Sequence, residues 1–209
     1  VVDYKTGKKS FDLAELRYGL GLQMLLYLFT LKEEGQMLFG GHEIVPAGVL
    51  YTPAREPMLR CARDTEPEKI EKALKKELRR SGMVLEDPAV LQAMEHSALE
   101  SPCYLPIAVK RDGAVTGSLA SAEQLRKLSK YVDHILHEIT QEVFAGNIDA
   151  DPYARTPQQS ACTYCEFASA CHFENGCGSD RMEYIKATKN DEFWQYIDEV
   201  NGEGAHENG

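Results

Sequence analysis

The sequence predicts an α/β (α+β) fold in which a mixed β-sheet is flanked by helices and is incomplete at its N-terminal side. Short strand-like segments alternate with longer helical ones along the 209 residues. Hydrophobic residues make up 43% and charged residues 27%, as in an ordinary globular domain. The first segment, Val1–Lys5, already has the character of a strand in mid-course. We therefore expect the chain to be a fragment of a longer protein.

Two long helices are expected. Asp12 is a plausible N-cap, with Glu15 completing a capping-box-like start, and the helical pattern runs from Leu13 to Glu34. This helix is apolar nearly all round, which is typical of a buried helix. Ser121 caps a second, amphipathic helix that runs to Ala145. Its apolar positions are Leu125, Leu128, Val132, Ile135, Leu136, Ile139 and Val143.

The remaining elements are shorter. Strands are expected over Val1–Lys5 and His42–Tyr51, with a hairpin formed by Leu105–Lys110 and Ala114–Thr116. Helices are expected over Pro67–Arg80, Asp87–His96 and Glu192–Val200. The stretch from Pro152 to Gly178 is expected to be irregular, and residues 202–209 a disordered tail.

Composition excludes two classes of partner for the chain as a whole. The longest apolar stretch, Leu20–Leu31, is shorter than the roughly 20 residues that a bilayer span requires, so no membrane segment is expected. A net charge of −10 argues against general affinity for nucleic acid, although a local basic groove stays open. The basic run on the helix that begins at Pro67 is interpreted as a solvated face, because glutamates are interspersed with it.

Asp3 and Lys5 are the first candidate site residues. Residues two apart on a strand point to the same face, with Tyr4 turned into the core. A carboxylate can hold a divalent metal that activates water for phosphodiester hydrolysis, and a lysine can stabilise the developing negative charge. An exposed ion pair is the alternative interpretation of this short pattern.

Gln23 and Tyr27 lie four residues apart and therefore share one helix face. A buried amide without partners costs about 1–3 kcal/mol, so Gln23 must bond either a neighbouring strand or a ligand. In the functional interpretation, both side chains reach the edge of an active site and contact DNA or metal-bound water. In the alternative, they serve only the core.

Four of the six cysteines lie close together near the C-terminus. The pattern Cys162-x2-Cys165-x5-Cys171 indicates metal or iron–sulfur ligation in a reducing compartment, and therefore a cytoplasmic protein. Zinc and a cubane cluster each require four ligands, and the fourth is Cys177, His172 or a cysteine outside the chain. The isolated Cys61 and Cys103 are treated as ordinary residues.

Together these motifs resemble the RecB-type PD-(D/E)xK nucleases. Asp3-Tyr4-Lys5-Thr6-Gly7 is similar to their strand motif, and Gln23-x3-Tyr27 to their helix motif. The stretches Pro46–Tyr51 and Gly82–Pro88 and the cysteine spacing narrow the resemblance to the C-terminal nuclease domains of AddB-type subunits of bacterial helicase–nucleases. The resemblance runs from Val1 to about Phe173.

The resemblance implies a restriction-endonuclease-like core and a role for each motif residue. Asp3 would bind Mg²⁺ or Mn²⁺ together with the Tyr4 carbonyl, Lys5 would be the catalytic lysine, and Gln23 and Tyr27 would complete the site. Three of the four ligands of a 4Fe–4S cluster would be Cys162, Cys165 and Cys171. The implied organisation is a nuclease core over residues 1–150, a cysteine-rich loop over 151–178, and a helix and tail over 179–209.

The implied partners are DNA and an AddA-type subunit, within a complex that processes double-strand breaks. In the family, a second acidic residue and the fourth cysteine lie upstream of the position that corresponds to Val1. We therefore expect these 209 residues alone to be inactive, with the cluster absent, and an exposed sheet edge to favour a homodimer.

Two alternatives remain. One is a non-catalytic module, held together by zinc or a cluster, that binds DNA or a partner protein. The other is a Cas4-like nuclease with the same motifs. The long segment from Ala54 to Leu119 favours the AddB-type relative over that smaller one.

Overall fold

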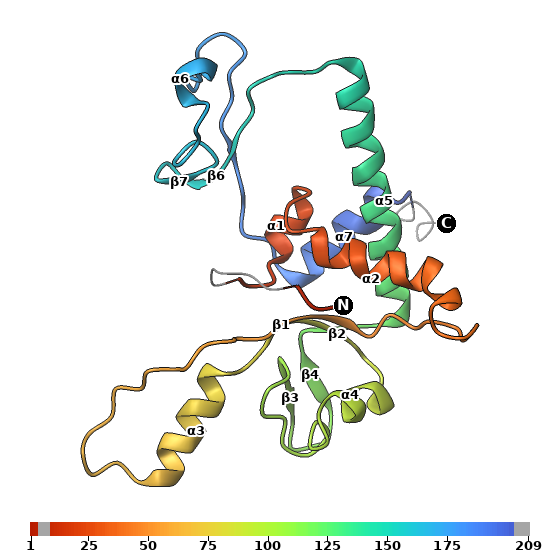
Figure 1. Ribbon diagram of the computed structural model, residues 1–209, viewed down its shortest axis with the longest axis vertical. Coiled ribbons are helices and arrows are strands. Elements are labelled where there is room, and N and C mark those ends of the chain that lie inside the picture. The colour runs from red at the N-terminus through yellow and green to blue at the C-terminus, as the bar shows by residue number, and fades with distance from the viewer. Residues whose placement is uncertain (4–8, 203–209) are drawn as a thin grey trace. The chain divides into compact units, whose positions relative to one another are not determined.

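The computed structural model describes residues 1–3 and 9–202, which divide into two compact units. The first unit contains Val1–Asp12 and Gly21–Ser129, and the second contains Leu13–Leu20 and the chain from Lys130 onward. Both units combine helices with short strands, so the expected α/β (α+β) class is confirmed (Figure 1). Within the described residues, no helix is long and apolar enough to cross a membrane.

A three-stranded mixed sheet organises the first unit. Its central strand, β2 (Ser81–Leu85), pairs antiparallel with β1 (Gly48–Tyr51) and parallel with β5 (Leu119–Ala120). Strand β2 is buried from its second residue to its last. The sequence pattern does not predict this strand, because a short apolar run between two helices has no periodicity that separates strand from helix.

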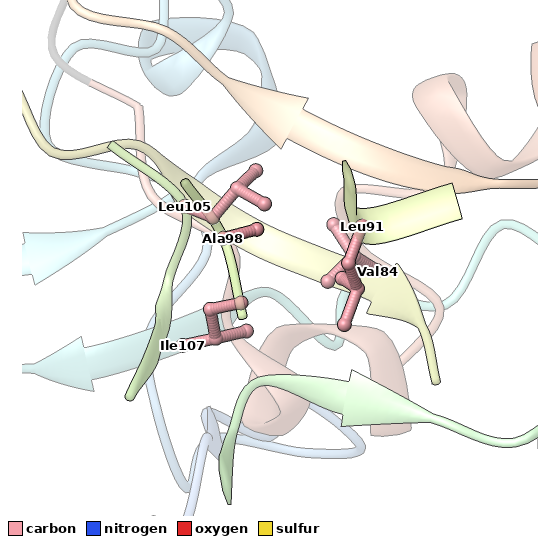
Figure 2. Close-up of a cluster of buried hydrophobic side chains, with 5 residues drawn as sticks. All are labelled: Val84, Leu91, Ala98, Leu105 and Ile107. Carbon is pink, nitrogen blue, oxygen red and sulfur yellow. The ribbon is translucent and has the colours of Figure 1, made fainter. Parts of the chain in front are cut away.

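The core of this unit packs against β2. Val84 lies in contact with a cluster whose members are 2% exposed or less: Leu91, Ala98, Leu105 and Ile107 (Figure 2). These residues come from β2, from α4 (Pro88–Met94) and from the chain that leads into β3 (Ile107–Val109). Full burial of a leucine or isoleucine side chain stabilises a fold by about 1.5–3 kcal/mol, so this cluster is a main source of stability for the unit.

Two helix starts confirm the caps expected from the sequence. Asp87 Oδ1 accepts a hydrogen bond from the Val90 amide at 3.0 Å, which begins α4. Ser121 Oγ accepts from the Gln124 amide at 3.1 Å, and Gln124 Oε1 accepts from the Ser121 amide at 2.9 Å. This reciprocal capping box starts α5 (Ala122–Ala145). The expected helix from Pro67 is also present as α3 (Pro67–Glu77), three residues shorter than predicted.

The continuous helix expected from Leu13 to Glu34 is wrong. The structure has a short helix α1 (Leu13–Arg17), a turn, and a second helix α2 (Gln23–Glu34), followed by the 3-10 turn η1 (Gly35–Met37). Gly19 and Gly21 have φ angles of +70° and +71°. A right-handed helix cannot contain such residues, so the two glycines end α1 and set the start of α2.

Several strands also differ from expectation. The strand expected over His42–Tyr51 is reduced to β1, because Pro46 cannot donate to a ladder and the chain becomes extended and paired only at Gly48. Val1–Asp3 have no regular secondary structure, and the rest of that predicted strand, Tyr4 and Lys5, lies outside the described residues. The expected hairpin is confirmed as β3 and β4 (Val115–Gly117).

The second unit is built around α1 and α7 (Asn190–Val200), which pack together. The Tyr131 hydroxyl of α5 donates to the carbonyls of Leu16 at 3.0 Å and Arg17 at 2.9 Å. Because its side chain is buried, the pKa of Tyr131 is raised and the hydroxyl stays a neutral donor. Phe193 and Ile197 of α7 are fully buried.

The cysteine-rich stretch has more regular structure than expected. It contains β6 (Tyr153–Thr156), β7 (Gln159–Ser160) and α6 (Ala168–Cys171), and β8 (Glu183–Tyr184) adds a parallel strand to β6. These strands are two to four residues long and leave few apolar side chains to bury, so no alternating pattern indicates them. The tail beyond Gly202, predicted to be disordered, lies outside the described residues.

Glu95 holds the loop between α4 and β3 in place. Its carboxylate accepts hydrogen bonds from the amides of Cys103 at 2.6 Å, Tyr104 at 3.1 Å and Leu105 at 2.9 Å. Burial alone raises the pKa of Glu95, but these three amides, aided by the Arg80 guanidinium, more than offset it and hold the pKa below its ordinary range. The loop that positions the buried Leu105 therefore depends on an ionised carboxylate.

Glu95→Gln is expected to lower the free energy of unfolding at pH 7 by about 2 kcal/mol, because hydrogen bonds to a charged acceptor are replaced by weaker ones. A carboxyl group whose pKa is lower in the folded state contributes fully above its unfolded pKa of about 4.3. That contribution is lost as the pH falls through the folded pKa, so the wild-type chain and the variant should converge in acid. Urea unfolding from pH 7 to pH 3 measures this. The exposed Glu100→Gln is the control, and equal losses in both variants would contradict the assignment.

Candidate active site

Helix α2 presents Gln23 and Tyr27 on one exposed face. The Gln23 amide Nε2 donates to the Tyr27 hydroxyl at 2.8 Å, so the two motif residues form a hydrogen-bonded pair. On the opposite face, Leu25 is 1% exposed and Phe29 is 6% exposed. Burial of that apolar face orients the helix and thereby aims the pair toward solvent.

This arrangement corrects one sequence expectation. The sequence predicts that Gln23 is buried in a helix that is apolar all round, but both Gln23 and Tyr27 are exposed. The polar pair lies on the solvent face because the helix starts at Gln23, only after Gly21, and packs through Leu25 and Phe29. An exposed pair needs no partner from the core, so its hydrogen-bonding groups are accessible to a ligand.

Asp3 belongs to the same compact unit as α2. Its side chain is half-buried, and Oδ2 is shielded from solvent. A carboxylate oxygen in such an environment is the type of ligand that Mg²⁺ prefers, so Asp3 suits the metal-binding role predicted for it. The other two members of the strand motif, Tyr4 and Lys5, lie outside the described residues, and their roles stay predictions.

The predicted cluster cysteines lie in the second unit. Cys162 follows β7 and is half-buried, Cys165 is exposed in the next turn, and Cys171 is the last residue of α6. The Cys165 amide donates to the Cys162 carbonyl at 3.3 Å, which closes a tight turn between these two thiols. After α6 the chain reverses at His172, whose φ is +52°.

The donor chemistry of the loop fits a cluster, but the arrangement does not yet form one. All four cysteines of the region are free thiols. Over residues 1–3 and 9–202, no three histidine, cysteine, aspartate or glutamate side chains are gathered closely enough to hold a metal ion. The thiols are therefore available as ligands without a preformed site, and the same finding adds no ligand group that the sequence had failed to indicate.

Comparison with known proteins identifies the class. Residues 1–172 match the model of the PD-(D/E)XK nuclease superfamily, which is more than half of the chain. The chain therefore belongs to the PD-(D/E)XK nuclease superfamily, and the restriction-endonuclease-like fold expected from the sequence is confirmed at this level.

Particular relatives share one name, and all are B subunits of an ATP-dependent helicase/deoxyribonuclease. The protein of Thermoanaerobacter sp. (strain X514) is 31% identical over 207 residues, covering 98% of this chain and 18% of the relative. That of Acetivibrio thermocellus is 33% identical over 199 residues, covering 94% and 17%. That of Bacillus thuringiensis (strain Al Hakam) is 35% identical over 208 residues, covering 97% and 18%. The predicted resemblance to AddB-type proteins is confirmed, and the chain spans less than a fifth of these relatives' length.

The exposure of the Gln23–Tyr27 pair predicts that its loss barely affects folding. Gln23→Ala and Tyr27→Phe should each change the free energy of unfolding by less than about 1 kcal/mol, as is usual for exposed polar contacts. Leu25→Ala, two residues from Gln23 on the buried face, should cost about 2–5 kcal/mol. Urea unfolding compares the three variants. A Tyr27→Phe loss as large as that of Leu25→Ala would show that the pair serves the core.

Proposed function

We propose that this chain is the nuclease domain of an AddB-type protein of a bacterial helicase–nuclease and takes part in metal-dependent hydrolysis of DNA phosphodiester bonds. The observation that carries the proposal is the exposed Gln23–Tyr27 pair, which stands on the solvent face of a helix where a motif residue of a nuclease is useful. The name of the relatives couples a deoxyribonuclease to an ATP-dependent helicase.

The proposed division of labour follows from residue chemistry. When bound, Mg²⁺ or Mn²⁺ would polarise the scissile phosphate and lower the pKa of a water molecule. Asp3 would hold the ion through its carboxylate, assisted by the Tyr4 carbonyl. Lys5 would stabilise the negative charge that develops on the phosphate, since an ammonium near the reacting group favours that charge. Gln23 and Tyr27 would donate hydrogen bonds that position the DNA backbone.

Further parts of the proposal concern the assembly. Residues 1–150 would carry the nuclease core, residues 151–178 a cluster loop, and residues 179–209 a helix and tail. Cys162, Cys165 and Cys171 would supply three thiolates to a 4Fe–4S cluster in the cytoplasm. DNA would be the substrate and an AddA-type helicase–nuclease chain the partner, in double-strand-break repair and recombination.

Lys5→Ala tests the catalytic role. In the assembled helicase–nuclease, the variant should cleave single-stranded DNA at least 100-fold more slowly with Mg²⁺ or Mn²⁺, as is common when a charge-stabilising group is removed. DNA affinity should change less than threefold, because Lys5 would act on the transition state. The measurements are product formation on a labelled oligonucleotide and fluorescence anisotropy without metal.

The exposed Lys9→Ala is the matched control, because it removes the same charge four residues away. It should retain both activities. Unchanged cleavage by Lys5→Ala would refute the catalytic assignment, whereas equal loss of DNA binding in both variants would indicate a general charge effect.

Iron and sulfide content tests the cluster. In the assembly isolated without oxygen, Cys162→Ser, Cys165→Ser and Cys171→Ser should each lose most of the bound iron and inorganic sulfide, because a thiolate ligand is removed. The exposed Cys61→Ser should retain both. If the wild-type assembly contains zinc and no sulfide, the zinc alternative replaces the cluster. A Cys177→Ser variant shows whether this residue is the fourth ligand.

A further inference from the structure

Helix α5 carries one continuous apolar stripe that is only half covered. Leu125, Leu128 and Val132 occupy the first part of the stripe and are buried. The same helical spacing continues through Leu136, Ile139 and Val143. These three are 38%, 50% and 71% exposed. The second half of α5 therefore presents to solvent the kind of face that its first half buries.

The uncovered part of the stripe borders a shallow groove. Figure 1 shows that the C-terminal half of α5 extends beyond α1 and α7, the other helices of its unit. The groove has a volume of about 380 Å³, and Ile139 and Val143 line it. The next large apolar side chains, Phe144 and Ile148, are 87% and 93% exposed. Contiguous exposed apolar surface of this kind usually marks an interaction site.

The rim of the groove is acidic. Glu138, Glu142, Asp149 and Asp151 line it together with the apolar residues. Between Tyr131 and Ala154 the sequence has no lysine or arginine. Two of the carboxylates are held in place: His134 Nε2 lies 3.3 Å from Glu138 Oε1, and Asn147 Nδ2 donates to Glu142 Oε2 at 2.6 Å.

We propose that the exposed half of α5 is a docking surface for a partner protein whose contacting helix has an apolar face edged by lysines or arginines. The apolar stripe would accept the partner's apolar side chains, as in other complexes where a helix lies in a groove. The acidic rim would pair with the partner's basic edge and fix its orientation.

The same charges disfavour two other occupants. Nucleic acid would bring phosphates against four carboxylates, and like charges in contact repel. A second copy of this chain, docked symmetrically, would bring the same acidic rim against itself. This surface lies in the second unit, apart from Asp3, Gln23 and Tyr27, so the proposal does not depend on the nuclease assignment.

Binding of a model peptide to the 209-residue chain tests the proposal. The probe is a fluorescent amphipathic helix of leucine and lysine, and the comparison is the same peptide with glutamate at every lysine. The lysine peptide should bind with a Kd of about 10 µM or tighter. The glutamate peptide should bind at least tenfold more weakly, and added salt should weaken the lysine peptide's binding.

Two exposed double variants locate the binding. Ile139→Ser with Val143→Ser, and Glu138→Lys with Asp149→Lys, should each weaken lysine-peptide binding at least tenfold. Glu33→Lys with Glu34→Lys makes the same charge change on exposed positions of α2 and should alter binding less than twofold. Circular dichroism checks that every variant retains the wild-type helix content.

Three results would overturn the proposal. The first is equal weakening by the α2 control, which would show general attraction to an acidic chain. The second is a dimer in sedimentation that the Ile139→Ser, Val143→Ser variant dissolves, which would assign the surface to a second copy. The third is single-stranded DNA that competes with the peptide and loses affinity in that variant.

Discussion

The left-handed backbone at Gly19 and Gly21 is the constraint on which the rest of the structure depends. It separates α1 from α2 within a stretch that is apolar throughout. The break also coincides with the boundary between units, because Leu13–Leu20 belongs to the second unit and the chain from Gly21 to the first. A side chain at either glycine would strain this turn, and a continuous helix would leave Gln23 in mid-helix instead of at the start of α2.

That break gives each half of the stretch its own role. Helix α1 joins α7 and Tyr131, whose hydroxyl binds two carbonyls at the end of α1. Helix α2 buries Leu25 and Phe29 and leaves Gln23 and Tyr27 hydrogen-bonded at the surface. The predicted site residues are thereby divided between units: Asp3, Gln23 and Tyr27 lie in the first, and the three cluster cysteines lie in the second.

Charge distinguishes the surfaces of the chain as clearly as burial does. The ionised Glu95 is used internally, where three backbone amides hold it and define a loop of the core. The carboxylates near the end of α5 are used at the surface, beside apolar side chains that nothing in their own helix needs exposed. A carboxylate held by amides stabilises one loop conformation, whereas exposed carboxylates around an apolar groove select a partner.

The sequence by itself determined the family, the fold class, the caps of α4 and α5, the β3–β4 hairpin and the Gln23–Tyr27 pairing. These depend on local spacing: Asp87 and Ser121 cap their own helices, and residues four apart meet on one helix face. Only the tertiary structure decided that Val84 lies in a central strand, that Gln23 faces solvent, and that the α5 stripe is covered as far as Val132 but not at Val143. The physical reason is that burial of an apolar residue depends on which distant segment packs against it, and no local pattern contains that information.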